Sequence, residues 1–362
     1  MNRLIPAPTK EVIFLPDWSR GNPYQNLLAK ALEKNGVSIT FNDFPIGAFP
    51  LNQVVNTNPN CAVLHLHWVN SLVDPIVWCR NPIKRKVKML LLALDIFVVR
   101  LRGKRVIWTI HNLVSHESNN PEWEIKARRV IARTCSHALL HSHSALKLVE
   151  KRYRVDLSDK VSIAVHGNYD GCYPSVEGME LKLRERFEID QDAIVILFFG
   201  AIRAYKGVER LIDAFHVVKD RNLRLLIAGS TADDSFAQNI LKASKDDSRI
   251  IPAIGFVPEN EVTALFSISD VVALPFEQTL TSGSATLACT MGKALLVPEN
   301  AKVFDFVNNH NALFFDSNTQ LTAALRKLDK IDLAKRGLHA REAVKGFVWE
   351  QEAAKIAATY GK

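Results

Sequence analysis

Short runs of apolar residues, each followed by a segment with helical spacing, recur along this chain and constrain its fold more than any other feature. The first run, residues 11–15, ends at Pro16 and is followed by apolar residues at helical spacing over residues 24–35. These runs are apolar throughout rather than alternating, which is typical of strands buried on both faces of a parallel sheet. The pattern therefore predicts an α/β chain in which helices cover both faces of parallel sheets.

The runs form two series, separated by a charged segment at residues 182–188. A chain of 362 residues also exceeds what one hydrophobic core usually serves. We predict two Rossmann-like, doubly wound domains at residues 1–175 and 176–345, and a C-terminal helix at residues 346–362 that returns to the N-terminal domain. Ligands of open parallel sheets bind at the carboxyl ends of the strands, so both sets of strand ends are expected to face a central cleft. Strands are expected at residues 11–15, 37–41, 62–68, 105–110, 137–141, 161–165, 193–200, 223–229, 249–255, 271–275 and 294–298.

The five cysteines are odd in number and widely separated, without the paired spacing of a zinc site or a redox motif. We expect them to be free thiols in a reducing compartment. The first ten residues lack the uninterrupted apolar core of a signal peptide. A cytoplasmic protein is therefore predicted.

The net charge of +8 is unevenly distributed along the chain. Residues 1–170 contain 23 Lys and Arg against 13 Asp and Glu, whereas the remaining residues contain 23 against 25. A basic half attracts anionic partners such as phosphate backbones and membrane surfaces. No recognition-helix, zinc-finger or aromatic-platform motif accompanies this charge, so nucleic acid is not expected as a partner.

Much of the basic charge flanks a single apolar segment at residues 89–99. The segment is too short to span a bilayer and is interrupted by Asp95. An apolar helix with basic ends suits the surface of an anionic membrane, and it equally suits an internal helix with solvated ends. Both alternatives stay open: peripheral contact with the inner face of the cytoplasmic membrane, or a purely structural helix. The basic residues are Arg80, Lys84, Arg85, Lys86, Lys88, Arg100, Arg102, Lys104 and Arg105.

A loop with two cations follows the strand expected at residues 193–199. It reads Gly-Ala-Ile-Arg-Ala-Tyr-Lys-Gly over residues 200–207 and precedes a helix, which places Arg203 and Lys206 beside a helix N-terminus. Free backbone N–H groups and two cations in such a position favour a diphosphate group. The alternative is a surface loop with two solvated charges.

A second helix start follows the strand expected at residues 271–275. Thr281, Ser282, Gly283 and Ser284 precede a helix rich in small residues. The hydroxyl groups and the glycine would let backbone N–H groups approach an anion closely. Ser and Thr in this position would also serve simply as helix caps.

Residues 193–298 carry a continuous series of motifs. The cationic loop is followed by a strand ending in Ala-Gly, then Gly-Phe-Val-Pro-Glu, then Ser-Asp-Val-Val-Ala-Leu-Pro, then a small-residue helix ending in Met-Gly-Lys. This order resembles the C-terminal domain of family 4 and related GT-B glycosyltransferases. The resemblance implies a nucleotide-diphosphate-sugar donor whose diphosphate contacts Arg203 and Lys206. It also implies that the nucleobase lies against Gly255, Phe256 and Val257.

One departure from the family pattern concerns two carboxylates. Family 4 enzymes have a Glu-x7-Glu pair that contacts the donor sugar and the ribose, and its positions here hold Thr279 and Leu287. Glu277 and residues 281–284 are expected to substitute, as in branches resembling bacterial exopolysaccharide β-glycosyltransferases and β-mannosyltransferases. The missing pair favours an inverting rather than a retaining mechanism.

Two residues of the N-terminal half are rival candidates for the catalytic base. His111 ends an expected strand and resembles the strand-end histidine of this superfamily, which reaches the donor sugar; imidazole also titrates near neutral pH. Asp17 lies in the loop after the first strand, where GT-B enzymes commonly bind the acceptor, and its alternative role is an Asx turn. Gly21, Asn22 and Tyr24 of the same loop are the expected acceptor contacts.

No metal site and no cofactor are expected. His65 and His67 lie on one face of a strand end, but no third ligand accompanies them at a convincing spacing. Asp190 and Asp192 precede a strand rather than follow one, so they would lie at the wrong end of the sheet for a metal diphosphate. Helix N-termini and the two loop cations would supply positive charge in place of a divalent ion.

Together these features predict a hexosyltransferase that uses a GDP- or UDP-sugar and acts on a polyprenyl-diphosphate-linked or polysaccharide acceptor in bacterial exopolysaccharide synthesis. Two alternatives stay open. One is a nucleotide-sugar epimerase on the same fold, and the other is a non-catalytic protein that binds a glycan.

Overall fold

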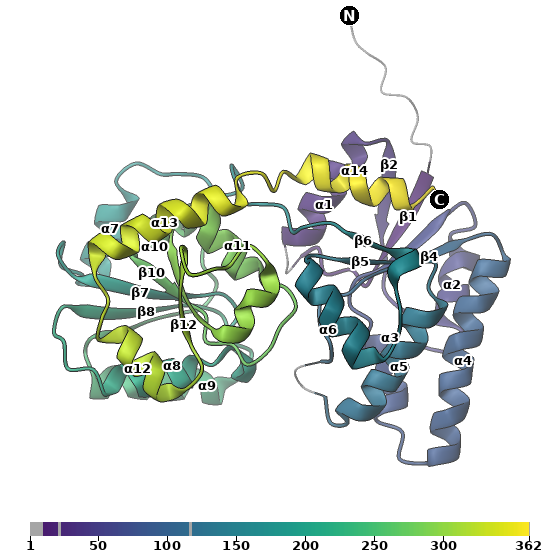
Figure 1. The fold of residues 1–362 in the computed structure, drawn as a ribbon, viewed down its shortest axis with the longest axis horizontal. Coiled ribbons are helices and arrows are strands. Elements are labelled where there is room, and N and C mark those ends of the chain that lie inside the picture. Colours follow the sequence, from purple (N-terminus) through teal and green to yellow (C-terminus); the bar gives the residue numbers. More distant parts are fainter. Residues whose placement is uncertain (1–9, 21–22, 116–117, 362) are drawn as a thin grey trace, which may run out of the picture. The chain divides into compact units, whose positions relative to one another are not determined.

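The computed structural model of the protein describes residues 10–20, 23–115 and 118–361. The chain forms two compact units, of which the first comprises Met1–Gly167 and Phe347–Lys362 and the second comprises Asn168–Gly346. Each unit is built on one six-stranded sheet whose neighbouring strands are all parallel (Figure 1). The predicted α/β fold class of two doubly wound sheets is confirmed.

The sheet of the first unit has its first strand next to an edge strand rather than at the edge itself. Its strands are β1 (Lys10–Leu15), β2 (Val37–Phe41), β3 (Val63–Leu66), β4 (Arg105–Thr109), β5 (His137–Leu140) and β6 (Val161–Ile163), in the order β2-β1-β3-β4-β5-β6. Its helices are α1 (Pro23–Lys34), α2 (Pro50–Thr57), α3 (Asn70–Val77), α4 (Pro82–Leu101), α5 (Pro121–Thr134), α6 (His143–Tyr153) and α14 (Trp349–Thr359). Because right-handed crossovers reverse direction after β2, helices lie on both faces of the sheet.

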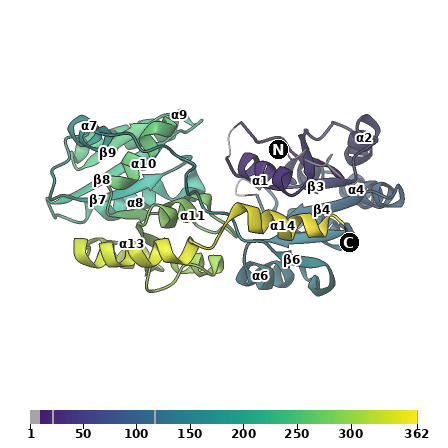
Figure 2. The same cartoon turned by 90° about the horizontal axis from the view of Figure 1, so that it is seen from above.

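One face of this sheet is covered by helices from the two ends of the chain. Helix α14 runs beside α1, as Figures 1 and 2 show, and both pack on the sheet through a shared apolar core. The buried carboxylate of Glu352 in α14 accepts a hydrogen bond from the Val165 N–H at 2.9 Å. The terminal helix is therefore an integral layer of the first unit.

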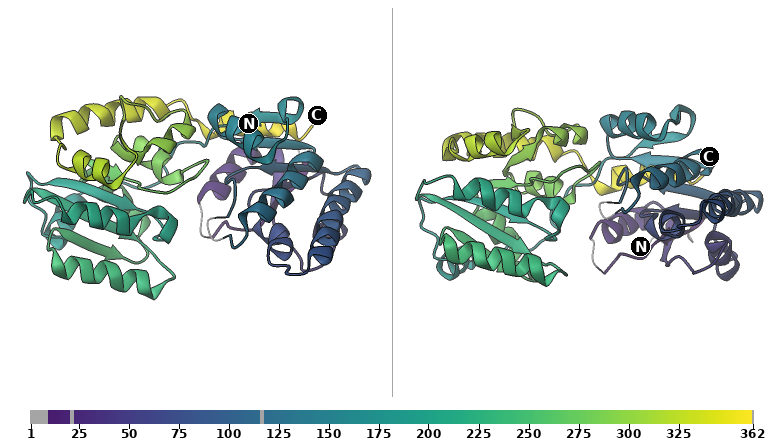
Figure 3. Two further views of the ribbon diagram at one scale, coloured as in Figure 1. Left: turned by 60° about the horizontal axis from the view of Figure 1, so that its bottom comes forward. Right: turned by 90° about the horizontal axis from the view of Figure 1, so that it is seen from below.

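The second unit repeats the same design with a different strand order. Its strands are β7 (Ile194–Phe199), β8 (Leu223–Gly229), β9 (Ile250–Ile254), β10 (Val271–Ala273), β11 (Ala294–Pro298) and β12 (Ala312–Phe315), in the order β12-β11-β10-β7-β8-β9. Its helices are α7 (Met179–Arg186), α8 (Val208–His216), α9 (Asp234–Asp246), α10 (Glu259–Ser267), α11 (Gly283–Thr290), α12 (Asn318–Leu325) and α13 (Lys330–Val344). Helices α8, α9 and α12 lie on one face, and α7, α10, α11 and α13 lie on the other (Figures 1 and 3).

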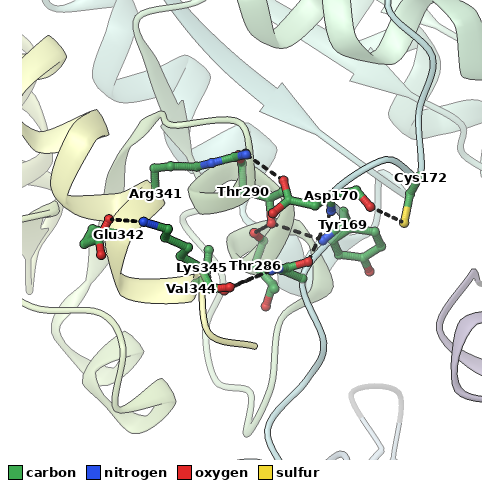
Figure 4. A network of polar contacts seen from close by, with 10 residues as sticks. Tyr169, Asp170, Cys172, Thr286, Thr290, Arg341, Glu342, Val344 and Lys345 are labelled. Atoms are coloured by element: carbon green, nitrogen blue, oxygen red, sulfur yellow. Dashed lines mark hydrogen bonds and ion pairs between the residues drawn. The ribbon is translucent and has the colours of Figure 1, made fainter. Parts of the chain in front are cut away.

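Polar contacts attach the entering chain of the second unit to its last helix (Figure 4). The Asn168 side chain donates to the carbonyl oxygen of Val344 at 3.1 Å. Arg341 forms an ion pair with Asp170 at 2.7 Å and also donates to the carbonyl oxygen of Thr290. These contacts bring the first boundary to residues 167/168, whereas the apolar pattern alone suggested 175/176.

Helix α4 is held in place by a buried carboxylate. Asp95 accepts hydrogen bonds from the backbone N–H groups of Leu51 at 2.8 Å and Asn52 at 3.0 Å, in the first turn of α2. Phe49, the residue that precedes α2, makes no side-chain cap. Asp95 therefore supplies the missing cap from another helix.

Within the described residues, no helix combines the length and apolar content needed to cross a bilayer.

Two glycines at neighbouring strand ends allow a test of how tightly the second sheet is packed. Gly229 and Gly255 both have positive φ, +150° and +140°, but a Cβ on Gly229 would lie 1.9 Å from the Gly200 carbonyl oxygen, whereas one on Gly255 would meet nothing within 4 Å. We expect Gly229→Ala to lower the free energy of unfolding by about 2 kcal/mol more than Gly255→Ala, because only the former adds a backbone clash to the strain. Urea denaturation followed by circular dichroism measures the difference, and equal effects would contradict the close approach.

Candidate functional site

The carboxyl ends of β7, β8 and β9 are joined by backbone hydrogen bonds beyond the strands themselves. The Ile202 N–H donates to the Ser230 carbonyl at 2.8 Å, and the Gly255 N–H donates to the Gly229 carbonyl at 2.9 Å. Arg203, which is exposed, and Lys206 therefore lie on a loop that the sheet edge holds in a defined path. This is the place in a parallel sheet where ligands bind.

The cationic loop and the segment after β10 lie against each other. The Glu277 N–H donates to the Tyr205 carbonyl oxygen at 3.0 Å. Gly207 has φ +73°, and a Cβ there would lie 2.3 Å from the carbonyl oxygen of Pro275. Only glycine permits this approach, so backbone contacts hold the cationic loop against the chain that leads to the second predicted anion-binding segment.

The N-terminus of α11 completes this edge. The Ser282 hydroxyl accepts from the Ala285 N–H at 3.2 Å, so its side chain caps the helix, as one of the two interpretations of this segment required. Ser284 Oγ lies 3.1 Å from where a Cβ on Gly200 would be, which places the helix start beside the end of β7. No acidic residue occupies the first turn of α11. The helix dipole is therefore available to an anion.

Lys206 is a partly buried cation at this edge of the sheet. Burial of its ammonium group, with a smaller effect from the neighbouring Arg203 charge, lowers its pKa to about 8. In the part of the chain that the structure describes, no carboxylate lies within ion-pair distance of Lys206. A partly buried cation without a counter-charge is a favourable site for an anionic ligand.

The remaining predicted donor contacts occupy the rim of the same edge. Phe256 directly follows the positive-φ Gly255 and is 84% exposed, while Val257 is half-buried. An exposed aromatic ring at the end of β9 offers a face for a planar base. The exposed Glu277 and the half-buried Thr281 lie on the segment that contacts the cationic loop, and Thr281 is bonded locally to Thr279.

A cluster of five buried histidines marks the corresponding edge of the first unit. Each histidine lies in or shortly after one of the adjacent parallel strands β3, β4, β5 and β6, and each is at most 9% exposed. Their rings stack or meet edge to face around Tyr24. The members of this histidine cluster are His65, His67, His111, His141 and His166.

Hydrogen bonds fix the orientation of the rings in the histidine cluster. His65 bonds the Tyr360 hydroxyl and the Thr109 hydroxyl, both at 2.7 Å. His67 Nδ1 lies 3.3 Å from His111 Nε2, so one of these two rings donates a hydrogen bond to the other. His65 is thus saturated by the protein, whereas Nε2 of His67 has no partner among the described residues.

Burial keeps the histidine cluster neutral. It lowers the pKa of His65 and His166 to about 3 and that of His141 to about 4, and it lowers the pKa of His67 and His111 well below the ordinary value. Neighbouring imidazoles add to the effect at four of the five, since a second positive charge nearby is unfavourable. The cluster therefore offers neutral imidazole donors and acceptors at neutral pH.

Buried contacts anchor the chain that follows His111. Glu124 and Arg128 form a buried ion pair at 2.7 Å, and Glu124 also accepts from the Ser115 N–H at 2.6 Å. The Tyr153 hydroxyl donates to the Leu113 carbonyl at 2.7 Å. These contacts fix the segment that follows β4, and they therefore hold His111 at the end of that strand.

Stacked rings connect the Asp17 loop with His111. Trp18 stacks on Trp68 with 4.3 Å between centroids, and Trp68 stacks on His111 at 4.6 Å. Asp17 Oδ1 accepts from the Ser19 N–H at 3.0 Å and from its hydroxyl at 2.6 Å, which lowers the pKa of Asp17. The Asx turn considered for Asp17 is therefore formed, and its carboxylate is ionised and only partly buried.

The three predicted acceptor contacts have different outcomes. Gly21 and Asn22 lie outside the described residues. Tyr24 is 3% exposed and packs inside the histidine cluster, so it shapes the site from within rather than presenting its ring at the surface. Tyr24 lies in the first turn of α1. It is the first of the apolar residues at helical spacing that predicted this helix, which agrees with its buried position.

Sequence reasoning did not identify His141 as a site residue, and for His166 it left open whether the residue lines a cleft or packs at the domain junction. His141 and His166 each follow a short apolar run, as His111 does, and the repetition of histidine after successive strands was the available signal. His65 and His67, for which a hydrogen-bonded structural role or a place in the cleft lining was favoured over a metal site, are bonded to Tyr360, Thr109 and His111. Among the described residues, no group of three or more suitable side chains is arranged to hold a metal ion.

Comparison with known proteins identifies relatives for both the whole fold and the second unit. Residues 179–337 match the family described as glycosyl transferases group 1. A GDP-mannose:glycolipid 4-beta-D-mannosyltransferase of Xanthomonas campestris pv. campestris is 28% identical over 285 residues, covering 76% of this chain and 73% of that protein.

Solved structures extend the similarity to almost the entire chain. Anabaena HepE in complex with UDP and glucose has a TM-score of 0.71 at 13% identity, covering 97% of this chain and 99% of that one. Sucrose-phosphate synthase of Thermosynechococcus elongatus has a TM-score of 0.74 at 14% identity, covering 97% and 98%. At this identity the structural likeness concerns the fold.

The neutral histidine cluster predicts acid destabilisation of the first unit. Unfolded histidines titrate near pH 6.5, so below that pH the unfolded state binds more protons and stability falls until the folded pKa values of about 3 to 4 are reached. At about pH 5.5 each cluster histidine should lower the free energy of unfolding by roughly 1.2 kcal/mol relative to pH 7. All six tryptophans lie in the first unit, so tryptophan fluorescence during urea unfolding reports on it.

A matched pair of variants tests this assignment. His141→Gln removes one cluster histidine and should weaken the pH dependence by about one proton. His143→Gln removes a histidine whose ring is exposed in the folded state, and should leave the pH dependence as in the unmodified protein. Stability that is unchanged from neutral pH to pH 5.5 would contradict a neutral buried cluster.

Proposed function

Because this chain is a glycosyltransferase of the GT-B fold whose residues 179–337 match the glycosyl transferases group 1 family, we propose that it transfers a hexose from a nucleotide-diphosphate sugar to a lipid-linked glycan. The observation that carries the proposal is the partly buried ammonium group of Lys206, which has no ion-pair partner among the described residues and lies at the start of α8, on a loop that contacts the segment leading to α11. Such an arrangement is suited to a diphosphate.

GDP-mannose is the proposed donor. Support comes from the Xanthomonas relative, whose name specifies GDP-mannose as donor, a glycolipid as acceptor and a β-linked product. The structure contributes an exposed Phe256 ring at the end of β9 for the base and a carboxylate, Glu277, held by its backbone beside the cationic loop. UDP-sugars are the alternative donors that the same contacts would accept.

Lys206, Arg203 and the first turn of α11 are proposed to stabilise the departing nucleoside diphosphate. As the bond between the sugar C1 and the diphosphate oxygen breaks, negative charge develops on that oxygen. Two cations and the backbone N–H groups of Gly283 and Ser284 would stabilise that charge without reorganisation. The proposal assigns this role to protein groups rather than to a divalent ion.

Asp17 is proposed as the base that accepts the proton of the acceptor hydroxyl. In an inverting transfer the acceptor oxygen attacks C1 from the face opposite the diphosphate, and its proton passes to a carboxylate or an imidazole. Asp17 is ionised and partly exposed, whereas burial makes His111 a poor proton acceptor. We assign His111 the role of a neutral hydrogen-bonding group for the donor sugar.

The acceptor is proposed to be a polyprenyl-diphosphate-linked oligosaccharide reached from the cytoplasmic face of a membrane. Support comes from the glycolipid named for the relative and from the basic character of residues 1–170. The exposed Trp18 ring beside Asp17 is a suitable surface for a sugar of the acceptor.

Lys206→Ala tests the diphosphate site. We expect a rise in the Kd for GDP of about tenfold to a hundredfold, since a charge-assisted hydrogen bond contributes about 1.5–3 kcal/mol. Binding to the unmodified protein should weaken as the pH rises through about 8, where Lys206 loses its proton, and the variant should lose that dependence. Isothermal titration measures both effects.

Lys219→Ala is the control for Lys206→Ala, because Lys219 lies beyond the other end of α8. It should bind GDP as the unmodified protein does. An equal loss in both variants, or GDP binding that does not change with pH, would contradict the assigned site.

Transfer activity that persists in EDTA is expected, and its loss would overturn the proposed independence from divalent ions.

Asp17→Asn separates a catalytic role from a structural one. Asparagine keeps the Asx turn with Ser19 but removes the charge, so we expect kcat to fall by about 10²- to 10⁴-fold with little change in donor affinity. Asp156→Asn makes the same change in an equivalent turn with Ser158 and should leave kcat unchanged. Steady-state kinetics with GDP-mannose and a lipid-linked acceptor would decide. Full activity of Asp17→Asn would leave His111 as the base.

A further inference from the structure

Six large apolar side chains of α4 face solvent along one side of the helix. They are spaced alternately by four and three residues and are 41–72% exposed. At about 100° per residue, they fall within roughly 80° of one another around the helix axis. Single exposed apolar residues are common, but a continuous row along a whole helix marks an interaction surface. The row, called the α4 stripe below, consists of Ile83, Val87, Leu90, Leu94, Phe97 and Leu101.

The rest of the fold keeps the α4 stripe turned outward. Leu92, Ile96 and Val99 lie on the opposite side of α4 and are buried. The buried Asp95 carboxylate binds the first turn of α2 through Leu51 and Asn52, which fixes the rotation of α4 about its axis. Turning the stripe inward would strand this carboxylate and uncap α2, so the stripe belongs to the folded surface.

The charge around the α4 stripe is of one sign. Asp95 is the only acidic residue of α4 and it is buried. Lys84 and Arg100 lie on either side of the stripe in the helix projection, and further basic side chains cluster at the two ends of α4. None of these side chains has an ion-pair partner among the described residues. The exposed basic residues in and next to α4 are Arg80, Lys84, Lys86, Lys88, Arg100 and Arg102.

This charge pattern selects one kind of partner. Two copies of α4 packed stripe to stripe would bring basic residues together without opposing carboxylates, which disfavours self-association. An anionic lipid surface satisfies both features, because apolar side chains enter the boundary of head groups and acyl chains while Lys and Arg attract anionic head groups. Trp78, just before α4 and 63% exposed, is a residue typical of that boundary.

We propose that α4 is an interfacial helix that lies on an anionic bilayer, with the α4 stripe inserted and the flanking basic residues among the head groups. The inference rests on the proposed function for its biological role, since a lipid-linked acceptor is met at such a surface. Contact with the bilayer itself requires no reaction and can be measured without one.

Flotation with lipid vesicles tests the proposal directly. The full chain should float with vesicles of phosphatidylcholine mixed with phosphatidylglycerol, and much less with phosphatidylcholine alone. Leu90→Glu combined with Phe97→Glu should reduce binding at least tenfold, because both apolar insertion and charge are impaired. Lys84→Glu combined with Lys86→Glu should also reduce it at least tenfold, because each basic residue near the surface contributes about 1 kcal/mol.

Matched controls exist in the second unit. Ile331→Glu with Leu338→Glu places the same charges on exposed apolar residues of α13, and Lys242→Glu with Lys245→Glu does so for exposed lysines of α9. Both controls should float as the unmodified protein does. Circular dichroism confirms that every variant is folded.

Three results would overturn the proposal: equal binding to neutral and anionic vesicles, equal losses in the control variants, or a dimer in sedimentation that Leu90→Glu with Phe97→Glu converts to a monomer.

Transfer to a water-soluble acceptor is measured in parallel. The α4 variants should retain it and lose only transfer to the lipid-linked acceptor in vesicles. Loss of vesicle binding with intact transfer to the soluble acceptor, or absence of all transfer with intact binding, therefore distinguishes failure of one proposal from failure of the other.

Discussion

Both sheets of this protein are parallel and covered by helices on both faces, and the positions of the candidate functional groups follow from that constraint. A strand covered by helices on both sides has no free face for polar chemistry, so reactive side chains can be placed only where the strands end. In the second unit this gives Arg203 and Lys206 after β7, Phe256 after β9 and the α11 start after β10. In the first unit it gives a histidine at the ends of four successive strands.

The two units use this constraint in electrostatically opposite ways. The second unit assembles positive charge: a desolvated ammonium group, an exposed guanidinium and a helix start without acidic residues. The first unit assembles neutral rings, because five imidazoles in one buried cluster cannot share several positive charges. Asp17, the carboxylate of the first unit that is proposed as the base, lies outside the histidine cluster on a partly exposed turn.

Packing also explains a residue that is difficult to interpret in the linear chain. Asp95 interrupts the apolar segment at residues 89–99, and a charged residue there argues against a membrane span. In the fold it caps α2, and in doing so it sets which side of α4 is buried. The α4 stripe is the consequence of that choice: the buried side of α4 is that of an internal helix, and a membrane surface stays the proposal for the exposed side.

The sequence by itself determined the fold class, the strands of both sheets except the edge strand β12, and the positions of the two candidate anion-binding segments, because apolar runs and loop motifs are local properties of the chain. It could not determine that Gly207 meets Pro275, that Ser284 lies beside Gly200, or that His65 is saturated by Tyr360, since each pair is distant in sequence. Nor could it reveal the pKa values of the histidines, which depend on burial among one another. Spacing specifies which residues end strands; only packing decides which of those ends become neighbours and which side chains lose their water.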